Sequence, residues 1–298
     1  MTFARRVKIN GTKVDTYLYP ADMKQPQWHA WTFDLPAGLA NVENMTIGIE
    51  GGEGIIYVDT IRLYPLASEM IDPIVPDNTE LLASYPFEGN YQDASGNGLH
   101  GSAVGAAAVV SDAQRGSVLS LDGIGSCVDL GADSRFNFPG SFTLAAWVNI
   151  TDFTVNWGHN IMSKRGENNV GWQIRRYESS SNLTFTVRGT DGDDMPRGTT
   201  DMSAYFNEWV QITAVYDLAA GMRSMYVNGL LDVAVKDGGV VAAATHNVYI
   251  GARAVGANTG PERFFRGMVD DVRIYNRALS QAEVLGLTGS TDPIYKPF

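Results

Sequence analysis

Short runs in which apolar and polar residues alternate recur along this chain, and they limit its fold more than any other feature. Successive side chains of a strand point to opposite faces, so each run predicts a half-buried β-strand. The clearest runs predict that one face turns inward at Phe142, Leu144 and Ala146, at Leu183, Phe185 and Val187, and at Met225 and Val227.

Glycine-containing turn sequences separate these runs. They occur at 95–98 (SGNG), 121–123 (LDG), 191–194 (DGDD), 227–229 (VNG) and 236–239 (KDGG). Many short strands joined by tight turns are typical of an all-β antiparallel sandwich or jelly roll. Helical spacing appears only at 278–287, where Ser280 and Glu283 form a capping-box pattern.

The charge balance excludes some partners. The chain has 22 Lys and Arg against 33 Asp and Glu, a formal net charge of −11. Nucleic acids and anionic membrane surfaces select clustered basic residues, so neither is an expected partner. No apolar run approaches the roughly 18–20 residues of a membrane span, so no membrane insertion is expected. The lone Cys127 excludes an intramolecular disulfide framework and a cysteine zinc site.

A proline-rich, acidic stretch without alternation divides the chain. It predicts a first domain at 1–66, a linker at 67–80 and a second domain at 81–298. A heptamer of the pattern V-D-x-(I/V)-R-(L/I)-Y lies near the end of each domain, at 58–64 and 269–275. We interpret the two heptamers as equivalent strands of related sandwiches, with chance similarity as the alternative.

The second domain resembles a known family over about 200 residues. The segments that carry the resemblance are LLASYPFEGNYQDASGNGLHG, GSVLSLDGIGSCVDLG, SFTLAAWVNI, NEWVQITAVYD, MYVNGLLD and FRGMVDDVRIYNRALSQAEVLGL, in that order. Together they are similar to a concanavalin A-like (laminin G-like) jelly roll of the bacterial secreted type. The resemblance implies an extracellular or cell-surface location, and a fold that serves lectins, adhesion modules and glycanases.

The first domain resembles only part of a fold. WHAWTFDLPAGLANVENMTIGIEGGEGIIYVDTIRLYP is similar to the C-terminal part of a galactose-binding-like carbohydrate-binding sandwich. A whole sandwich needs about 100 residues, so the opening strands are expected to be missing. Because a half sandwich leaves a sheet edge uncovered, we expect it to pack on the second domain or to self-associate with another copy.

Several acidic residues stand beside turns, where carboxylate and carbonyl oxygens suit Ca²⁺. The family resemblance implies one calcium ion, with Asp270 as the first ligand and Asp122 or the Gly123 carbonyl next. Further candidate ligands are Glu88, Asp93 and, through the repeated heptamer, Asp59 with Glu50 or Glu53 at a second ion. The alternative is that Asp93 and Asp122 form Asx-turns and that Asp270 is a solvated acid.

Sugar binding needs an aromatic platform and planar polar groups. If Trp172 and Ile174 face the core, then Gln173, Arg175 and Tyr177 share the opposite face. Trp147, Trp172 and Trp209 are expected in the core, whereas Trp157 is the candidate for an exposed ring. The full set of candidate ligand-binding residues is Trp157, His159, Gln173, Arg175, Tyr177, Arg188, Asp191, Asp193 and Arg253.

Catalytic residues are not identified. The chain has no E-x-D-x-E-like carboxylate spacing and no G-x-S-x-G elbow. The sequence therefore predicts a calcium-stabilised module that binds a polysaccharide or glycoconjugate. Two alternatives stay open: a hydrolase of glycans or esters with a site around 157–194, and a structural or adhesive spacer. Pairs such as His159 with Asp152, or His246 with Asp237, are candidates for the hydrolase.

Overall fold

The chain divides into two compact units, residues 1–70 with 295–298 and residues 71–294. The computed structural model describes residues 4–9, 12–18, 45–50, 70–153, 159–165, 170–188, 195–256 and 259–295. We take each unit by itself. The boundary between them lies within the segment predicted to be a linker.

The described part of the first unit is a three-stranded antiparallel sheet. Its order is β2-β1-β3, with β1 at Ala4–Ile9, β2 at Thr12–Leu18 and β3 at Met45–Glu50. The remaining predicted strands, including the heptamer at 58–64, lie outside the described residues. The partial carbohydrate-binding-type sandwich and its self-association therefore stay predictions.

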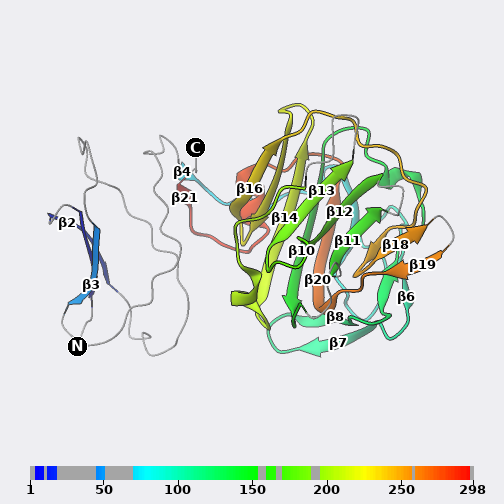
Figure 1. Cartoon of the computed structure of the whole chain (residues 1–298), viewed down its shortest axis with the longest axis horizontal. Coiled ribbons are helices and arrows are strands. Elements are labelled where there is room, and N and C mark those ends of the chain that lie inside the picture. Colours follow the sequence, from blue (N-terminus) through cyan, green and yellow to red (C-terminus); the bar gives the residue numbers. More distant parts are fainter. Residues whose placement is uncertain are drawn as a thin grey trace. The chain divides into compact units, whose positions relative to one another are not determined.

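The second unit is a two-sheet antiparallel β-sandwich, which confirms the predicted fold class (Figure 1). The eight-stranded sheet runs in the order β16 (Leu230–Lys236), β15 (Met222–Val227), β14 (Trp209–Asp217), β10 (Phe142–Ile150), β20 (Arg266–Tyr275), β8 (Gly116–Asp122), β7 (Ala108–Asp112), with β5 (Leu81–Tyr85) also paired to β20. The six-stranded sheet runs in the order β13 (Leu183–Arg188), β12 (Gly171–Arg176), β11 (Asn160–Arg165), β17 (Tyr249–Ile250), β9 (Cys127–Asp129), β6 (Ser102–Val104).

One hydrophobic core fills the space between the two sheets. All eight side chains predicted to face inward belong to it. Phe142 of β10 meets Phe185 of β13 edge to face, with ring centroids 5.9 Å apart, so the contact joins the two sheets directly. The alternation in the sequence therefore identifies the inner face of both sheets.

The three tryptophans expected in the core do not share one environment. Trp172 is fully buried there and donates from Nε1 to the Phe136 carbonyl at 2.9 Å. Trp147 and Trp209 instead lie half-buried on the outer face of the eight-stranded sheet, so the core prediction is wrong for these two. Strand parity explains the difference, because Ala146, Val148 and Val210 beside them take the inward positions.

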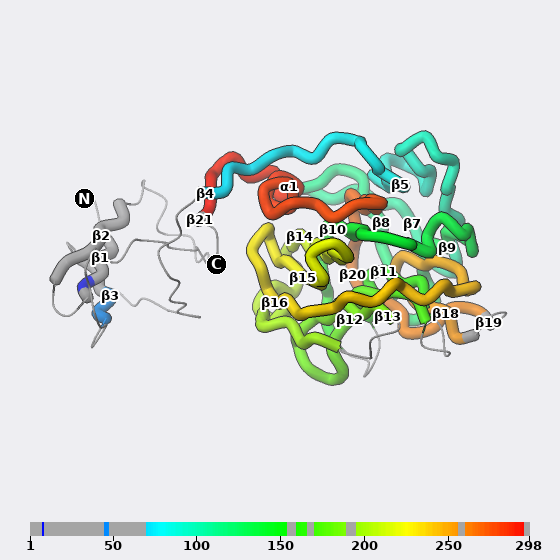
Figure 2. The backbone as a smooth tube through the Cα atoms, turned by 90° about the horizontal axis from the view of Figure 1, so that it is seen from above, coloured from blue at the N-terminus to red at the C-terminus, as the bar shows by residue number. Residues whose placement is uncertain are grey.

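Smaller elements complete the second unit. The predicted helix is confirmed as α1 (Gln281–Gly286), and its capping box joins Ser280 and Glu283 as expected. A hairpin of β18 (Arg253–Gly256) and β19 (Thr259–Glu262) lies beside β11 and β17 (Figure 1). At the boundary between the two units, the short strands β4 (Met70–Ile71) and β21 (Ile294–Tyr295) pair with each other (Figure 2). Among the described helices, none is long and apolar enough to cross a membrane.

Candidate functional site

The outer face of β11, β12 and β13 carries polar side chains in three rows across the strands. The pairing register defines the rows as Arg165–Gly171–Arg188, Ser163–Gln173–Thr186 and Asn160–Arg175–Thr184. Between these rows, Met162, Trp172, Ile174, Phe185 and Val187 belong to the apolar core, so the polar rows lie on the opposite face. We call these rows the polar face.

Gln173 connects the rows at the centre of the polar face. With its amide oriented so that the oxygen meets the guanidinium groups, Gln173 accepts from Arg165 Nη1 at 2.6 Å and from Arg175 Nε at 3.0 Å. Its amide nitrogen then donates to Asn160 Oδ1 at 3.2 Å. One planar side chain thus fixes two guanidinium groups from neighbouring strands.

Positive charge is concentrated at the polar face. Burial, together with the like charges of Arg188, Arg175, Arg253 and Arg263, lowers the pKa of Arg165 to about 9. Burial and the charges of Arg263 and Arg253 likewise lower the pKa of Arg175 to about 10, opposed by Glu178. An arginine keeps its proton at physiological pH, so these shifts express the free-energy cost of holding the charges together.

Three hydroxyl groups of the polar face have no hydrogen-bond partner among the described residues. They are Ser163 Oγ, Thr184 Oγ1 and Thr186 Oγ1, and all three side chains are fully buried. A buried hydroxyl that makes no hydrogen bond costs about 1–3 kcal/mol. Such groups in native proteins require a physical explanation, and a polar ligand that bonds to them is one.

The β18–β19 hairpin forms one edge of the polar face. Glu262 Oε1 accepts from Arg253 Nη2 at 2.6 Å and lies 3.3 Å from Arg263 Nε. The Arg253 and Arg263 side chains keep 11% and 31% of their surface exposed, whereas Arg175 keeps only 3%. This hairpin is therefore the more accessible border of the charged cluster.

The structure brings together four of the residues predicted to bind ligand. Gln173, Arg175 and Arg188 share the polar face, and Arg253 lies at its edge. Tyr177 lies half-buried at the end of β12 with the Arg197 guanidinium 5.8 Å from its ring centroid. Trp157, Asp191 and Asp193 lie outside the described residues, so their roles stay predictions.

Sequence reasoning missed the other members of the site. These are Asn160, Ser163, Arg165, Thr184, Thr186 and Arg263. The alternation that placed Gln173 and Arg175 outward also holds in β13 and in most of β11. This alternation was the sequence signal that could have identified the missed residues on these strands. A register shift between Asn160 and Met162 breaks that alternation at the start of β11, which hides Asn160.

His159 is buried next to the ring of Phe153. Its side chain is 1% exposed, and its ring meets that of Phe153 edge to face at 5.1 Å. Burial, aided by the nearby charge of Arg176, lowers its pKa to about 4. Asp152, its hypothetical catalytic partner, accepts from Arg266 Nη1 at 2.7 Å. His159 is therefore uncharged at neutral pH, and its role in ligand binding stays a prediction.

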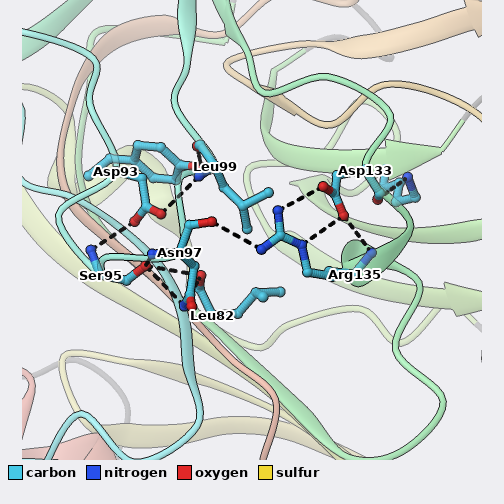
Figure 3. Close-up of polar contacts among 9 residues, drawn as sticks. Leu82, Asp93, Ser95, Asn97, Leu99, Asp133 and Arg135 are labelled. Carbon is cyan, nitrogen blue, oxygen red and sulfur yellow. Dashed lines mark hydrogen bonds and ion pairs between the residues drawn. The ribbon is translucent and has the colours of Figure 1, made fainter.

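Two of the acids predicted to bind calcium organise turns, as the alternative interpretation expects, and Figure 3 shows the turn at Asp93. Asp93 accepts backbone hydrogen bonds from Ser84, Ser95 and Leu99 at 2.9–3.0 Å. Asp122 accepts from three backbone N–H groups and from Ser126 Oγ. Burial alone raises the pKa of Asp122, but these hydrogen bonds outweigh it and lower the pKa to about 2.

The other predicted ligands have varied surroundings. Asp270 is buried and ion-paired with Arg115, so it is not the solvated acid of the alternative interpretation. Gly123 has a positive φ, and a Cβ there would meet the Arg266 side chain at 2.6 Å. Glu88 is exposed, and Asp59 lies outside the described residues. Over the described ranges, no three Asp, Glu, His or Cys side chains are grouped so as to hold a metal ion.

Comparisons with known proteins relate the second unit to one superfamily. A family model described as the concanavalin A-like lectin/glucanases superfamily matches residues 122–285. Domain 4 of AbnA, an extracellular GH43 arabinanase from Geobacillus stearothermophilus solved in complex with arabinotriose, is 20% identical with a TM-score of 0.54. That alignment covers 70% of this chain and 98% of the arabinanase domain.

Toxin binding domains have the same fold. One is a structure of botulinum neurotoxin type C, whose cell entry is described as dependent on interaction with two ganglioside molecules. It is 18% identical to this chain, with a TM-score of 0.57. The binding domain of botulinum neurotoxin DC, in complex with SialylT, is 19% identical, with a TM-score of 0.55. Both alignments cover 72% of this chain and 52% of the toxin chain, so this chain spans about half of either toxin structure. No curated protein matches the sequence.

Proposed function

The chain belongs to the concanavalin A-like lectin/glucanases superfamily, and from this premise we propose that its second unit binds a carbohydrate through the polar face. The observation that carries the proposal is the set of unpartnered hydroxyls at Ser163, Thr184 and Thr186. Sugar hydroxyls both donate and accept hydrogen bonds, so they complement hydroxyl, amide and guanidinium groups arranged on one face.

Structural relatives support this proposal at the level of the fold. The arabinanase domain was solved with arabinotriose. One toxin structure is described with two ganglioside molecules, and another is a complex with SialylT. We further propose an extracellular role, because the arabinanase is extracellular and the predicted resemblance is to secreted proteins. The glycan bound here is not carried over from these relatives, since identities of 18–20% establish only the shared fold.

Calcium stabilisation stays a separate proposal. The acid-rich turn sequences support the calcium proposal. In the structure, Asp93 and Asp122 accept hydrogen bonds from backbone groups, and Asp270 is ion-paired with Arg115. The two proposals are independent, because the polar face contains no predicted calcium ligand. Binding assays in calcium and in EDTA therefore test them separately.

One experiment tests binding and distinguishes it from hydrolysis. The full chain is incubated with soluble and insoluble polysaccharides, in calcium or EDTA, and each sample is assayed for protein depletion and for released reducing sugar. We expect depletion without release, and affinity that falls when the polar face is altered. Release that scales with protein concentration would favour the hydrolase, and neither signal would favour the structural spacer.

A further inference from the structure

The central row of the polar face continues beyond β11. Ser163 pairs with Tyr249 of β17, and Tyr249 pairs with Asp129 of β9. The next residue, Ile250, belongs to the core between the sheets, so Tyr249 lies on the same outer face as Ser163 and Gln173. An aromatic residue is therefore the strand neighbour of a hydroxyl that has no hydrogen-bond partner among the described residues.

The β18–β19 hairpin covers this aromatic ring. Ala252 and Ala254 form one buried apolar cluster with Tyr249 and Cys127, and Phe264 packs against that cluster. Among the described residues, β18 and β19 pair only with each other, so the hairpin is not a part of the six-stranded sheet that it contacts. Its first arm contributes two alanine side chains to the cluster, and an alanine buries little apolar surface.

Both ends of the hairpin have the backbone geometry of a hinge. Gly251 precedes the hairpin with a φ of 87°, and Arg263 follows it with a φ of 57°. Residues other than glycine rarely adopt the second of these conformations, and such outliers cluster at segments that switch between states. Backbone hydrogen bonds from Gly251 N to Ile161 O and from Asn160 N to Arg263 O hold the two ends on β11. The hairpin is thus fixed at its base.

We propose that the β18–β19 hairpin is a lid over the polar face, which lifts to admit a sugar ring onto Tyr249. The ion pair of Arg253 with Glu262 joins the two strands of the hairpin, so it stays intact as the hairpin lifts. The uncovered aromatic ring then packs on the apolar face of the sugar, beside the hydroxyls of the polar face. This inference rests on the proposed function and adds the route of entry and the aromatic contact.

Cys127 is a natural probe of the lid, because it is the only cysteine and belongs to the cluster that the hairpin covers. Burial raises the pKa of its thiol to about 12, so reaction requires opening. Labelling of the full chain by N-ethylmaleimide is followed by mass spectrometry at low urea concentrations. A lid predicts a labelling rate that barely changes with urea, because local opening exposes little surface. A rate that rises with the slope of global unfolding would overturn the lid.

A pair of alanine variants assigns the labelling to the hairpin. Ala254→Asp places a carboxylate in the cluster with Tyr249 and Cys127, and we expect at least tenfold faster labelling. Ala219→Asp introduces the same charge at an exposed position in the turn after β14, and it should label at the wild-type rate. Near-ultraviolet circular dichroism checks that both variants are folded. Equal rates in the two folded variants would contradict the lid.

A reversible lock connects the lid to binding. Ala254→Cys gives the hairpin a thiol that forms a disulfide with Cys127 on oxidation. Affinity for soluble arabinan, galactan, xylan and dextran is measured before and after reduction by dithiothreitol. We expect at least tenfold weaker binding by the oxidised form and full recovery on reduction. Cys127→Ala/Ala254→Cys cannot form the disulfide, so it should bind equally in both conditions.

Variants of Tyr249 test the aromatic contact without any disulfide. Tyr249→Leu removes the ring and should weaken binding at least tenfold, whereas Tyr249→Phe keeps the ring and should bind within about threefold of the wild type. Wild-type affinity in the locked protein or in Tyr249→Leu would contradict the inference and leave the proposed function standing. Absence of binding to all four polymers by the wild type would contradict the proposed function, and the labelling of Cys127 would still decide whether the hairpin opens.

Discussion

Arg115 donates from Nε to Asp270 Oδ2 at 2.7 Å, across 155 positions of sequence. The same guanidinium lies 4.3 Å from the Trp147 ring centroid and 5.4 Å from that of Trp209, and its Nη2 meets Asp271 at 3.0 Å. These contacts fix the turn between β7 and β8 against the outer face of the eight-stranded sheet. Asp270 therefore has a structural partner that accounts for its burial.

The Asp270 pair predicts a loss of stability that does not depend on calcium. Asp270→Asn removes the charge from a mostly buried pair, and we expect the free energy of unfolding to fall by roughly 2–4 kcal/mol. Asp271→Asn, at a side chain 37% exposed, is the control and should cost under about 1 kcal/mol. Urea denaturation in calcium and in EDTA measures both. A loss confined to calcium buffer would instead identify Asp270 as a calcium ligand.

Hydroxyls of the polar face predict an unusual response to valine. Thr184→Val/Thr186→Val removes two unpartnered buried hydroxyls and keeps the side-chain shape, so stability should stay the same or rise by about 1 kcal/mol. Thr143→Val is the matched control, because Thr143 Oγ1 donates to the Arg277 carbonyl and accepts from Leu279 N. That variant should lose about 1–3 kcal/mol. Equal losses in thermal denaturation would show that the polar-face hydroxyls are hydrogen-bonded within the protein.

His159 predicts part of the dependence of stability on pH. Its pKa of about 4 lies below the ordinary value of 6.5, so between these values the unfolded chain binds a proton that the folded protein does not. The neutral His159 therefore makes its full contribution to the free energy of unfolding above pH 6.5. That contribution, at most about 3 kcal/mol, is lost as pH falls towards 4. His159→Asn tolerates the positive φ and does not titrate. Its stability should fall less steeply over this range than that of the wild type, and parallel curves would refute the assignment.

The tryptophans predict a clear difference between the two faces of the sandwich. Trp172→Leu leaves space in the core and an unpaired Phe136 carbonyl, so we expect a loss of about 3 kcal/mol. Trp147→Leu lies outside the core and loses the contact with Arg115, for which about 1 kcal/mol is expected. Chemical denaturation of both variants measures the difference, and a larger loss at Trp147 would contradict the assignment of faces.

The sequence predicted well which face of a strand each side chain occupies. It predicted poorly which distant residues pack over that face. Alternation placed Gln173, Arg175 and Arg188 together, and local capping chemistry placed α1 correctly. Parity also assigned Trp147 outward, but residue type suggested a core position. Apolar bulk alone does not reveal that Arg115 covers that ring from a distant turn.

Long-range electrostatics explains most of what the sequence could not reveal. The partner of Asp270 comes from the turn that follows β7, and the charges acting on Arg165 come from β12, β13 and the β18–β19 hairpin. Neither arrangement has a local signature, because each depends on which strands become neighbours in the sheets. By contrast, the Asx-turn at Asp122 bonds within four residues and was foreseeable as an alternative to a calcium ligand.

The most direct test of carbohydrate binding at the polar face measures affinity and stability together in Thr184→Val/Thr186→Val. Isothermal titration with the polysaccharide that depletes the wild-type protein should show at least tenfold weaker binding, while thermal denaturation shows no loss of stability. Thr143→Val should give the reverse, with affinity retained and stability reduced. Wild-type affinity in Thr184→Val/Thr186→Val would contradict the claim that the saccharide contacts the outer face of β11–β13.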